Sequence, residues 1–403
     1  MKKTIGVFVA MSIALVACSR GARIAGASAR NFSAVKVGLL ITTGGKGGDL
    51  AGPSIGAANV AVQRLKSEHH VDVKIEQADY QGDLATVPDL ARELESKSDV
   101  LVIGTDDPAV MPQLQGLTKP VLLAYITADD ATAAENFYRL APSDSLQAKV
   151  LAAILVDHRN LSRLGVIFEN GDYGKGGADL FEKAVTQAGA TLVAKEGFDT
   201  GGDIHTPAEL AADRGAQAVV LWTDNPAEAA RIVIDVHHSA LSYQLALPFD
   251  IAVPQFGKNA SAQVVPTAFR EGILSVGPWA GPWLNESRIT DFYKQFQKLQ
   301  NDVAPVRTST VFDAVLLASI AKTEGSITQG LGGIRDFEGA GAPITFDSHR
   351  EGIDESDLWA WGFTKSKSGA GVDFFPAVDT GGGFFTLIKA GNKVPARFRY
   401  ELS

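Results

Sequence analysis

Cysteine is nearly absent from this sequence of 403 residues, in which Cys18 is the only one. A single cysteine excludes an intrachain disulfide, and it excludes zinc or iron–sulfur sites built from several cysteines. Basic residues are also scarce, because 37 Lys and Arg stand against 46 Asp and Glu and the net charge is −9. Nucleic-acid binding depends on neutralising phosphates with Lys and Arg, so this composition argues against a nucleic-acid binder.

Long apolar runs are missing beyond the first 17 residues. No later run approaches the roughly 18 residues of a membrane-spanning helix, so none is expected there. Two lysines, Lys2 and Lys3, follow Met1, and an apolar stretch covers residues 5–17. This stretch is too short to span a bilayer and has the length of a signal-peptide core. We therefore expect residues 1–17 to be a signal peptide.

Cys18 follows this stretch directly, as the last residue of the tetrapeptide LVAC. An aliphatic residue and two small or mid-sized residues before a cysteine resemble a bacterial lipobox, which places a lipid on Cys18 after cleavage. The alternative is a buried, inert thiol. Residues 18–34 are rich in Ala, Gly, Ser and Arg, so we expect a flexible tether. Cleavage removes Lys2 and Lys3 and leaves a net charge of −11.

The remaining chain is long enough for two or three domains, and the 45% share of hydrophobic residues supports a sizeable core. Strand-like and helix-like patterns alternate in its first part. Strands are expected over residues 35–42, 71–78, 100–104 and 120–126, and helices over residues 53–68, 87–94 and 110–117. This order indicates βαβ units around a parallel sheet.

After a pause at residues 140–143, the same rhythm restarts. Strands are expected over residues 163–169, 191–195, 218–222, 244–248 and 273–276, and helices over residues 146–158, 176–188 and 227–238. Two further helices are expected over residues 287–300 and 310–323, and the last eighty residues are typical of loops with short strands. The chain therefore contains two α/β units of similar build, without a residue-level repeat.

Several short motifs occur in a characteristic order, although none is specific alone. They are Val37-Gly38, Gly52-Pro53, Gly56-Ala57, Asp79, Gly82-Asp83, Val102-Ile103-Gly104, Arg139-Leu140-Ala141-Pro142-Ser143-Asp144, Asp172-Tyr173-Gly174, Glu271-Gly272, Phe312-Asp313-Ala314-Val315 and Phe346-Asp347. Together they resemble the type I periplasmic binding proteins, specifically the leucine/isoleucine/valine-binding branch that feeds ABC importers. The resemblance runs from about residue 35 to residue 363.

The resemblance implies an α/β fold of two doubly wound parallel-sheet lobes joined by a three-strand hinge. The expected N-terminal lobe comprises residues 35–141 and 277–344, and the C-terminal lobe residues 142–276 and 345–403. The crossings between lobes are expected near Ala141, Val276 and Ile344.

The implied function is a lipid-anchored, extracytoplasmic receptor that binds a small polar solute, an amino acid or a related amino or amide compound, in the interlobe cleft. Its expected partner is an ABC permease in the bacterial cell membrane. We expect a monomer with no catalytic step, cofactor or metal. The alternative is a ligand-sensing accessory lipoprotein of the same fold that signals to a membrane partner.

Ligands of open α/β sheets bind outside the carboxyl ends of the strands. In amino-acid binders of this branch, hydroxyls and amides of the first lobe hold the carboxylate, and an acid of the second lobe holds the ammonium. Tyr173 matches the ligand-facing tyrosine of the family. Asp250 falls near the position of the ammonium-binding acid, and the alternative is a turn residue after a short strand.

The first lobe departs from the family pattern, because two acidic pairs replace small or hydroxyl residues. Thr105 and the pair Asp106-Asp107 follow one strand, and Thr127 and the pair Asp129-Asp130 follow the next. Like charges about 4 Å apart cost on the order of 1–4 kcal/mol, which is unfavourable beside a substrate carboxylate. A cationic or hydroxyl-rich ligand suits these acids better. The alternative is that Asp107 or Asp129 caps the following helix.

Two further features lie at strand ends. Trp222 ends a strand and Asp224 follows it, and both are candidate ligand contacts. The indole is a candidate to wall the cleft or stack on a cation, with a core tryptophan as the alternative. The loop of residues 44–48, with sequence GGKGG, follows the first strand. It is expected to be a turn at the cleft edge, or else an anion site made of exposed amides.

Catalytic interpretations find little support. Residues 52–56 match G-x-S-x-G with Ser54 at the centre, but a ten-residue loop separates Ser54 from the preceding strand, whereas a nucleophile elbow requires a sharp strand-to-helix turn. None of the seven histidines forms an H-x-x-x-H pair or another metal spacing. A binding protein is therefore favoured over a hydrolase.

Overall fold

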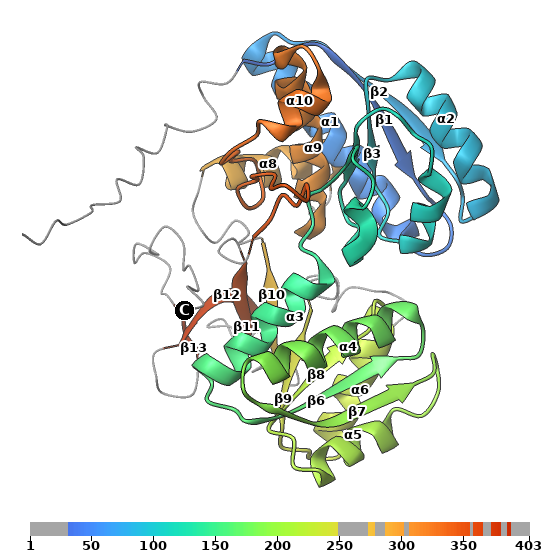
Figure 1. The fold of residues 1–403 in the computed structure, drawn as a ribbon. Helices are drawn as coiled ribbons and strands as arrows, with labels where there is room; N and C mark the ends of the chain where they lie inside the picture. Colours follow the sequence, from blue (N-terminus) through green and yellow to red (C-terminus); the bar gives the residue numbers. More distant parts are fainter. Residues whose placement is uncertain are drawn as a thin grey trace, which may run out of the picture.

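The computed structural model describes residues 31–248, 273–278, 287–301, 306–354, 358–365, 372–379 and 385–387. These residues form two lobes, one above the other in Figure 1, each built on its own sheet. This confirms the expected fold of two parallel-sheet α/β lobes. The expected signal peptide, Cys18 and Asp250 lie outside the described residues.

The first lobe contains a five-stranded parallel sheet with strand order β2-β1-β3-β4-β5. Its strands are β1 (Val35–Ile41), β2 (Val73–Asp79), β3 (Val100–Ile103), β4 (Val121–Leu123) and β5 (Phe137–Arg139). Its helices are α1 (Ala51–His69), α2 (Val87–Lys97) and, from later in the chain, α8 (Ser287–Gln300), α9 (Ser309–Ala321) and α10 (Ile327–Gly332). Short 3₁₀ helices η2 (Gly48–Leu50), η4 (Pro108–Leu114) and η5 (Asp129–Thr132) follow β1, β3 and β4.

Strand β1 is almost wholly buried because helices cover both faces of the sheet, which explains its continuous apolar sequence. Side chains of a strand point alternately to opposite faces. Val37 and Leu39 accordingly join the apolar cluster that includes α1 and α9, whereas Leu40 joins the cluster that includes α2. The sequence prediction differs at residues 110–117, where the structure has the 3₁₀ helix η4 with Pro112 inside it. Proline lacks the N–H that an α-helix interior requires.

The second lobe contains an eight-stranded sheet with strand order β13-β12-β11-β10-β9-β8-β6-β7. Its five strands β6 to β10 are parallel to one another. These parallel strands are β6 (Arg163–Glu169), β7 (Thr191–Phe198), β8 (Ala218–Trp222), β9 (Gln244–Leu247) and β10 (Leu274–Gly277). Antiparallel strands extend the sheet, namely β11 (Trp359–Lys365), β12 (Val372–Asp379) and β13 (Phe385–Leu387). The helices are α3 (Asp144–Ala153), extended by a π-helical turn over Ile154–His158, α4 (Asp172–Gln187), α5 (His205–Asp213) and α6 (Pro226–His238).

Helix α4 packs on β6 and β8 through a close contact between Gly177 and the indole of Trp222. Trp222 has no exposed surface and is the largest fully buried side chain among the described residues. A Cβ on Gly177 would lie 1.8 Å from the Trp222 Nε1 atom, far inside contact distance. Position 177 therefore requires glycine so that the helix can approach the sheet.

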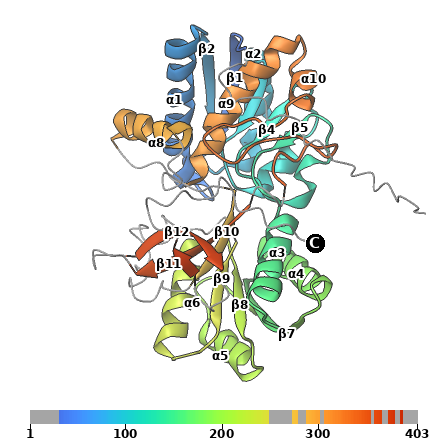
Figure 2. The ribbon, with the colours of Figure 1, turned by 90° about the vertical axis from the view of Figure 1, so that its left-hand side faces the viewer.

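The chain crosses between the lobes after β5, after β10 and between residue 353 and β11. Figure 2 shows the first of these crossings, where the chain runs from the upper lobe into α3 of the lower lobe. The first two crossings lie near the expected Ala141 and Val276. The third falls later than the expected Ile344, because the following segment still packs on the first lobe. Phe346 stacks edge-on against Tyr138 of β5, with 5.0 Å between ring centroids.

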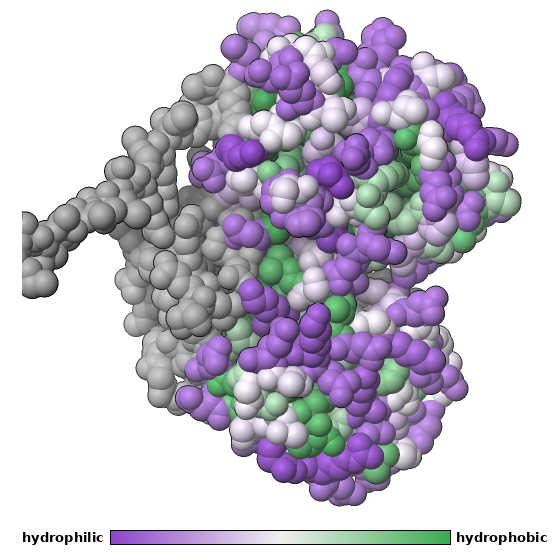
Figure 3. Space-filling view, in the orientation of Figure 1, coloured by the Kyte–Doolittle hydropathy of each residue, from purple (hydrophilic) through white to green (hydrophobic). Residues whose placement is uncertain are grey.

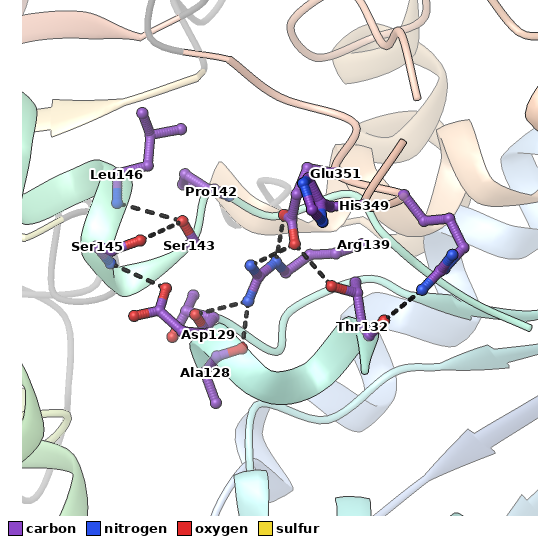
Figure 4. A network of polar contacts seen from close by, with 12 residues as sticks. Ala128, Asp129, Thr132, Arg139, Pro142, Ser143, Ser145, Leu146, His349 and Glu351 are labelled. Atoms are coloured by element: carbon purple, nitrogen blue, oxygen red, sulfur yellow. Dashed lines mark hydrogen bonds and ion pairs between the residues drawn. The ribbon is translucent and has the colours of Figure 1, made fainter. Parts of the chain in front are cut away.

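Arg139, at the end of β5, ties this returning segment to the first crossing (Figure 4). Its side chain is only 2% exposed, and it makes a bidentate ion pair with Glu351, with Nε–Oε2 and Nη2–Oε1 distances of 2.7 and 2.6 Å. Its Nη1 atom donates to the carbonyls of Thr127 and Ala128. The Thr132 hydroxyl donates to the Glu351 Oε1 atom at 2.9 Å. The buried guanidinium is thus fully engaged at the hinge.

The surface of both lobes in the view of Figure 3 is largely hydrophilic, with small scattered apolar patches. Leu299 is the one large hydrophobic side chain classed as exposed in the described part of the chain. None of the helices described there combines the length and apolar character needed to cross a membrane.

A substitution at Gly177 tests the helix–sheet contact. Gly177→Ala is expected to destabilise the protein by about 2 kcal/mol, because the added methyl group overlaps a fully buried indole. Urea unfolding followed by tryptophan fluorescence measures the change. The matched control is Gly176→Ala on the same helix, where no atom lies within 4 Å of the added Cβ. Equal stabilities of the two variants would contradict the packing argument.

Removal of Glu351 tests the hinge ion pair. Glu351→Ala is expected to lower the free energy of unfolding by about 3 kcal/mol, because it leaves the buried Arg139 charge uncompensated. Thermal and urea unfolding measure the loss. Glu338→Ala, at an exposed position of the same lobe, serves as the control and is expected to change stability by less than about 0.5 kcal/mol. A loss at position 351 no larger than at position 338 would show that the pair does not stabilise the hinge.

Candidate functional site

Each sheet reverses its strand order at one point, and a crevice opens there outside the carboxyl ends of the strands. In the first lobe, β2 lies on one side of β1 and β3 on the other. In the second lobe, β7 lies on one side of β6 and β8 on the other. The strands that border the two crevices are β1 and β3 in the first lobe and β6 and β8 in the second. The segments that follow them contain Lys46 after β1, Asp106 after β3, Tyr173 after β6 and Asp224 after β8.

A cavity of about 20 Å³ brings these four residues together between the lobes. We call it the interlobe cavity, and its lining consists of Lys46, Asp106, Pro108, Thr127, Ala128, Tyr173 and Asp224. Its volume suffices for about one water molecule. Two sequence-predicted acids, a predicted threonine and the predicted tyrosine thus meet at one place, together with a lysine from the glycine-rich loop.

Asp106 lines the interlobe cavity from the first lobe. Arg307, just before α9, donates from Nη1 to the Asp106 Oδ2 atom at 2.9 Å, and both side chains are mostly buried. The other carboxylate oxygen, Oδ1, is buried and has no hydrogen-bond partner within the described part of the chain. An ion pair within one lobe therefore fixes Asp106, while one of its oxygens remains an unused acceptor.

Lys46 joins the two lobes. Its ammonium forms an ion pair with Asp224 of the second lobe and lies 5.5 Å from the centre of the Tyr173 ring. The flanking Gly45 and Gly47 have φ angles of +66° and +80°, a conformation that favours glycine. A Cβ on Gly47 would lie 2.5 Å from the Thr105 hydroxyl oxygen, so glycine also permits the close approach of this loop to β3.

The charge on Lys46 follows from its surroundings. Burial lowers the pKa of Lys46, but the ion pair and hydrogen bond with Asp224, together with the nearby Asp106 and Asp107, outweigh this effect and leave the pKa above its ordinary value. The ammonium is therefore charged at neutral pH.

Three predicted residues make structural contacts outside the interlobe cavity. Thr105 is fully buried, and its hydroxyl lies 3.2 Å from the Tyr80 hydroxyl. Asp107 is the N-cap of η4 and accepts the Ala109 N–H at 3.0 Å, which is the contact of a helix cap. Trp222 lies in the core of the second lobe, so the structure places its ring away from the cavity.

Asp129 accepts the N–H of Ser145 in the first turn of α3, at 3.2 Å (Figure 4). It lines a separate, open hollow of about 460 Å³ beside the hinge, which also contains Arg139, Arg350 and Glu351. In this hollow Arg139 pairs with Glu351, and Arg350 donates from Nη2 to the Thr132 carbonyl at 2.8 Å. No group of metal-binding side chains occurs within the ranges that the structure describes.

Ser54 lies in the first turn of α1 and has no exposed surface. Its hydroxyl is 3.0 Å from the hydroxyl of Tyr125, which is also buried, and this burial raises the pKa of Tyr125. A serine nucleophile must be open to its substrate at a sharp turn. The position of Ser54 is that of a packing residue, which agrees with the sequence argument against a hydrolase.

Sequence reasoning missed two residues of this site. Lys46 had a local signal, since it is the one charged residue in the loop of residues 44–48. Arg307 had none, because it lies 201 residues from Asp106 in the chain.

Comparison with known proteins agrees with this architecture. A family model described as periplasmic binding protein matches residues 34–352. Search of the curated proteins finds no match.

Several solved structures share the fold at low sequence identity. The branched-chain amino acid transporter substrate-binding protein LivJ from Streptococcus pneumoniae, in complex with isoleucine, is 18% identical, with a TM-score of 0.68 over 85% of this chain and 99% of that chain. The leucine-binding protein LivK from Thermotoga maritima is 15% identical, with a TM-score of 0.71 over 86% and 99%. A solute-binding protein of an ABC transporter from R. palustris, in complex with benzoate, is 16% identical, with a TM-score of 0.68 over 86% and 97%.

The family match covers most of the chain, and the two lobes with their charged interlobe cavity have the arrangement that a solute receptor needs. The chain therefore belongs to the periplasmic binding protein family, whose members are solute-binding proteins.

Proposed function

We propose that this protein is the lipid-anchored, extracytoplasmic receptor of an ABC importer and that it captures a small polar solute between its lobes. The observation that supports this most directly is the convergence of Asp106, Thr127, Tyr173 and Asp224 on one interlobe cavity. Residues of both lobes line it, so a solute bound there stabilises the closed arrangement by contacting both at once. No covalent step is required of the protein.

The charges around the cavity favour a solute with ionic or hydrogen-bonding groups. Lys46 and Arg307 supply cations, while Asp224 and the free oxygen of Asp106 supply acceptors. Isoleucine and benzoate, the ligands of two proteins with this fold, both contain a carboxylate. We therefore propose an amino acid or a related amino or amide compound, with Asp106, Thr127, Tyr173 and Asp224 as contacts. Asp250 remains a prediction outside the described residues.

The start of the described chain is compatible with a membrane anchor. Ser33 pairs with Ser319 of α9, its N–H donating to the Ser319 carbonyl at 3.1 Å and its carbonyl accepting the Ser319 hydroxyl at 2.7 Å. Phe32 stacks on His69 at the end of α1, with 4.2 Å between ring centroids. A tether to a lipid on Cys18 would thus leave the first lobe at the amino end of β1, opposite the strand ends that form the site. Access to the cavity and to a permease remains open.

A thermal-shift screen tests the proposed function. Amino acids, amides, benzoates, polyamines, short peptides and sugars are added singly to the purified protein. A solute present at a hundred times its dissociation constant is expected to stabilise the folded state by about 2.7 kcal/mol, seen as a rise in the melting temperature. A well-folded protein whose melting temperature responds to none of these solutes would contradict the proposal.

Two neighbouring acids are expected to differ in their roles. Asp106→Asn should weaken binding of the solute found in the screen at least about tenfold, or 1.4 kcal/mol, because Asp106 lines the cavity. Asp107→Ala should leave the affinity unchanged and cost about 1 kcal/mol of stability, because Asp107 caps η4. Titration calorimetry and urea unfolding measure the two effects. A larger loss of affinity at position 107 than at position 106 would reverse the assignment.

A further inference from the structure

The Lys46 ammonium lies where a cation from outside the protein would bind. Asp224 provides a carboxylate and Tyr173 an aromatic face, and both belong to the second lobe. A carboxylate and an aromatic ring are the groups with which proteins hold ammonium ions. The cation itself comes from the first lobe, on a loop whose glycines let it reach across the cavity. The second lobe thus binds part of the first lobe as it would bind a ligand.

The two acids of the site differ in what neutralises them. Asp106 pairs with Arg307 of its own lobe, so its ion pair does not depend on lobe closure. Asp224 pairs with Lys46 across the gap, so this ion pair exists only when the lobes are together. The exposed fractions of the two side chains are 34% and 29%, so most of each has left water. Opening the lobes therefore breaks the Lys46–Asp224 pair and leaves the Asp106–Arg307 pair intact.

A cavity of about 20 Å³ holds a water molecule but no amino acid. A solute of that size fits only if the cavity widens, and Lys46 and Asp224, which line it from opposite lobes, then separate. The carboxylate of Asp224 then needs a new cation, and the most direct source is the solute.

We propose that Lys46 is a built-in latch: its ammonium takes the place of a solute cation at Asp224 and Tyr173, favours the closed arrangement of the lobes when no solute is bound, and competes with cationic groups of solutes. The competition with solutes rests on the proposed solute-binding function. The closing of the lobes by Lys46 does not, because it requires no solute.

The latch predicts that loss of the lysine charge opens the lobes. Small-angle X-ray scattering of the purified protein without added solute compares the wild type with Lys46→Gln and Asp224→Asn. Both variants are expected to have a larger radius of gyration, whereas Lys46→Arg, which keeps a cation, should restore the wild-type value. The matched control is Lys66→Gln, the same change of charge at an exposed position on α1. Circular dichroism checks that each variant is folded. An unchanged radius in folded Lys46→Gln would overturn the latch.

Competition between Lys46 and solute cations is measured by titration calorimetry with L-leucine and isoamylamine. The two probes have the same aliphatic chain and amine, and isoamylamine lacks the carboxylate. Lys46→Gln is expected to bind isoamylamine at least about tenfold more tightly than the wild type does, since Asp224 is then free to accept the amine. Lys66→Gln should bind it as the wild type does. Affinity for isoamylamine that is not raised in Lys46→Gln would overturn the competition.

The two hypotheses fail separately. If Lys46→Gln opens the lobes but no solute in the screen, leucine included, binds any variant, the proposed solute-binding function falls and the latch stands. If solutes bind the wild type and the radius of Lys46→Gln equals that of the wild type, the function stands and the latch falls.

Discussion

In each sheet the second strand along the chain lies on one side of the first strand and the third lies on the other. The connections that follow the first and third strands therefore run to opposite sides of the sheet. They leave a crevice at the carboxyl ends of these two strands, where side chains can reach a ligand. Because this happens once in each lobe, the loops after β1, β3, β6 and β8 line the interlobe cavity, together with Thr127 and Ala128 after β4. The location of the site is a consequence of strand order, and the loops decide only its chemistry.

The chemistry of the cavity depends on which charges are paired within a lobe and which across the gap. Arg139 with Glu351, and Arg307 with Asp106, are pairs that include a deeply buried guanidinium and hold their own neighbourhood rigid. Such pairs are costly to break, because a buried charge without its partner is strongly destabilising. Lys46 with Asp224 is a looser pair on a glycine-rich loop. A hinged receptor needs both kinds: firm contacts within each lobe, and a contact between lobes that binding can exchange.

Most of the fold could be predicted from the sequence, because buried parallel strands such as residues 35–41 and 218–222 are apolar runs with helices between them. The strand ends, and with them Asp224, followed from the same reasoning, whereas Tyr173 was expected from the resemblance to the family. What could not be predicted depends on distance across the chain. Arg307 reaches Asp106 because α9 packs beside β1 and β3, and Lys46 reaches Asp224 because the two lobes lie together. The burial of Trp222 could not be predicted from the sequence either, because a tryptophan at the end of a strand can line a cleft or lie in the core.

The acidic residues at the strand ends show how far composition can mislead about a site. Two acidic pairs in the first lobe, taken as free charges, argue for a cationic ligand and against a carboxylate. In the structure three of these four acids already have a partner: Asp106 pairs with Arg307, Asp107 accepts the Ala109 N–H and Asp129 accepts the Ser145 N–H. Backbone donors and a guanidinium offset the repulsion that a carboxylate would otherwise meet. With Lys46 facing Asp224, the formal charges that line the cavity or pair with its lining cancel. The choice of solute then depends less on net charge than on whether the solute can take over the partners that Lys46 and Asp224 give up when they separate.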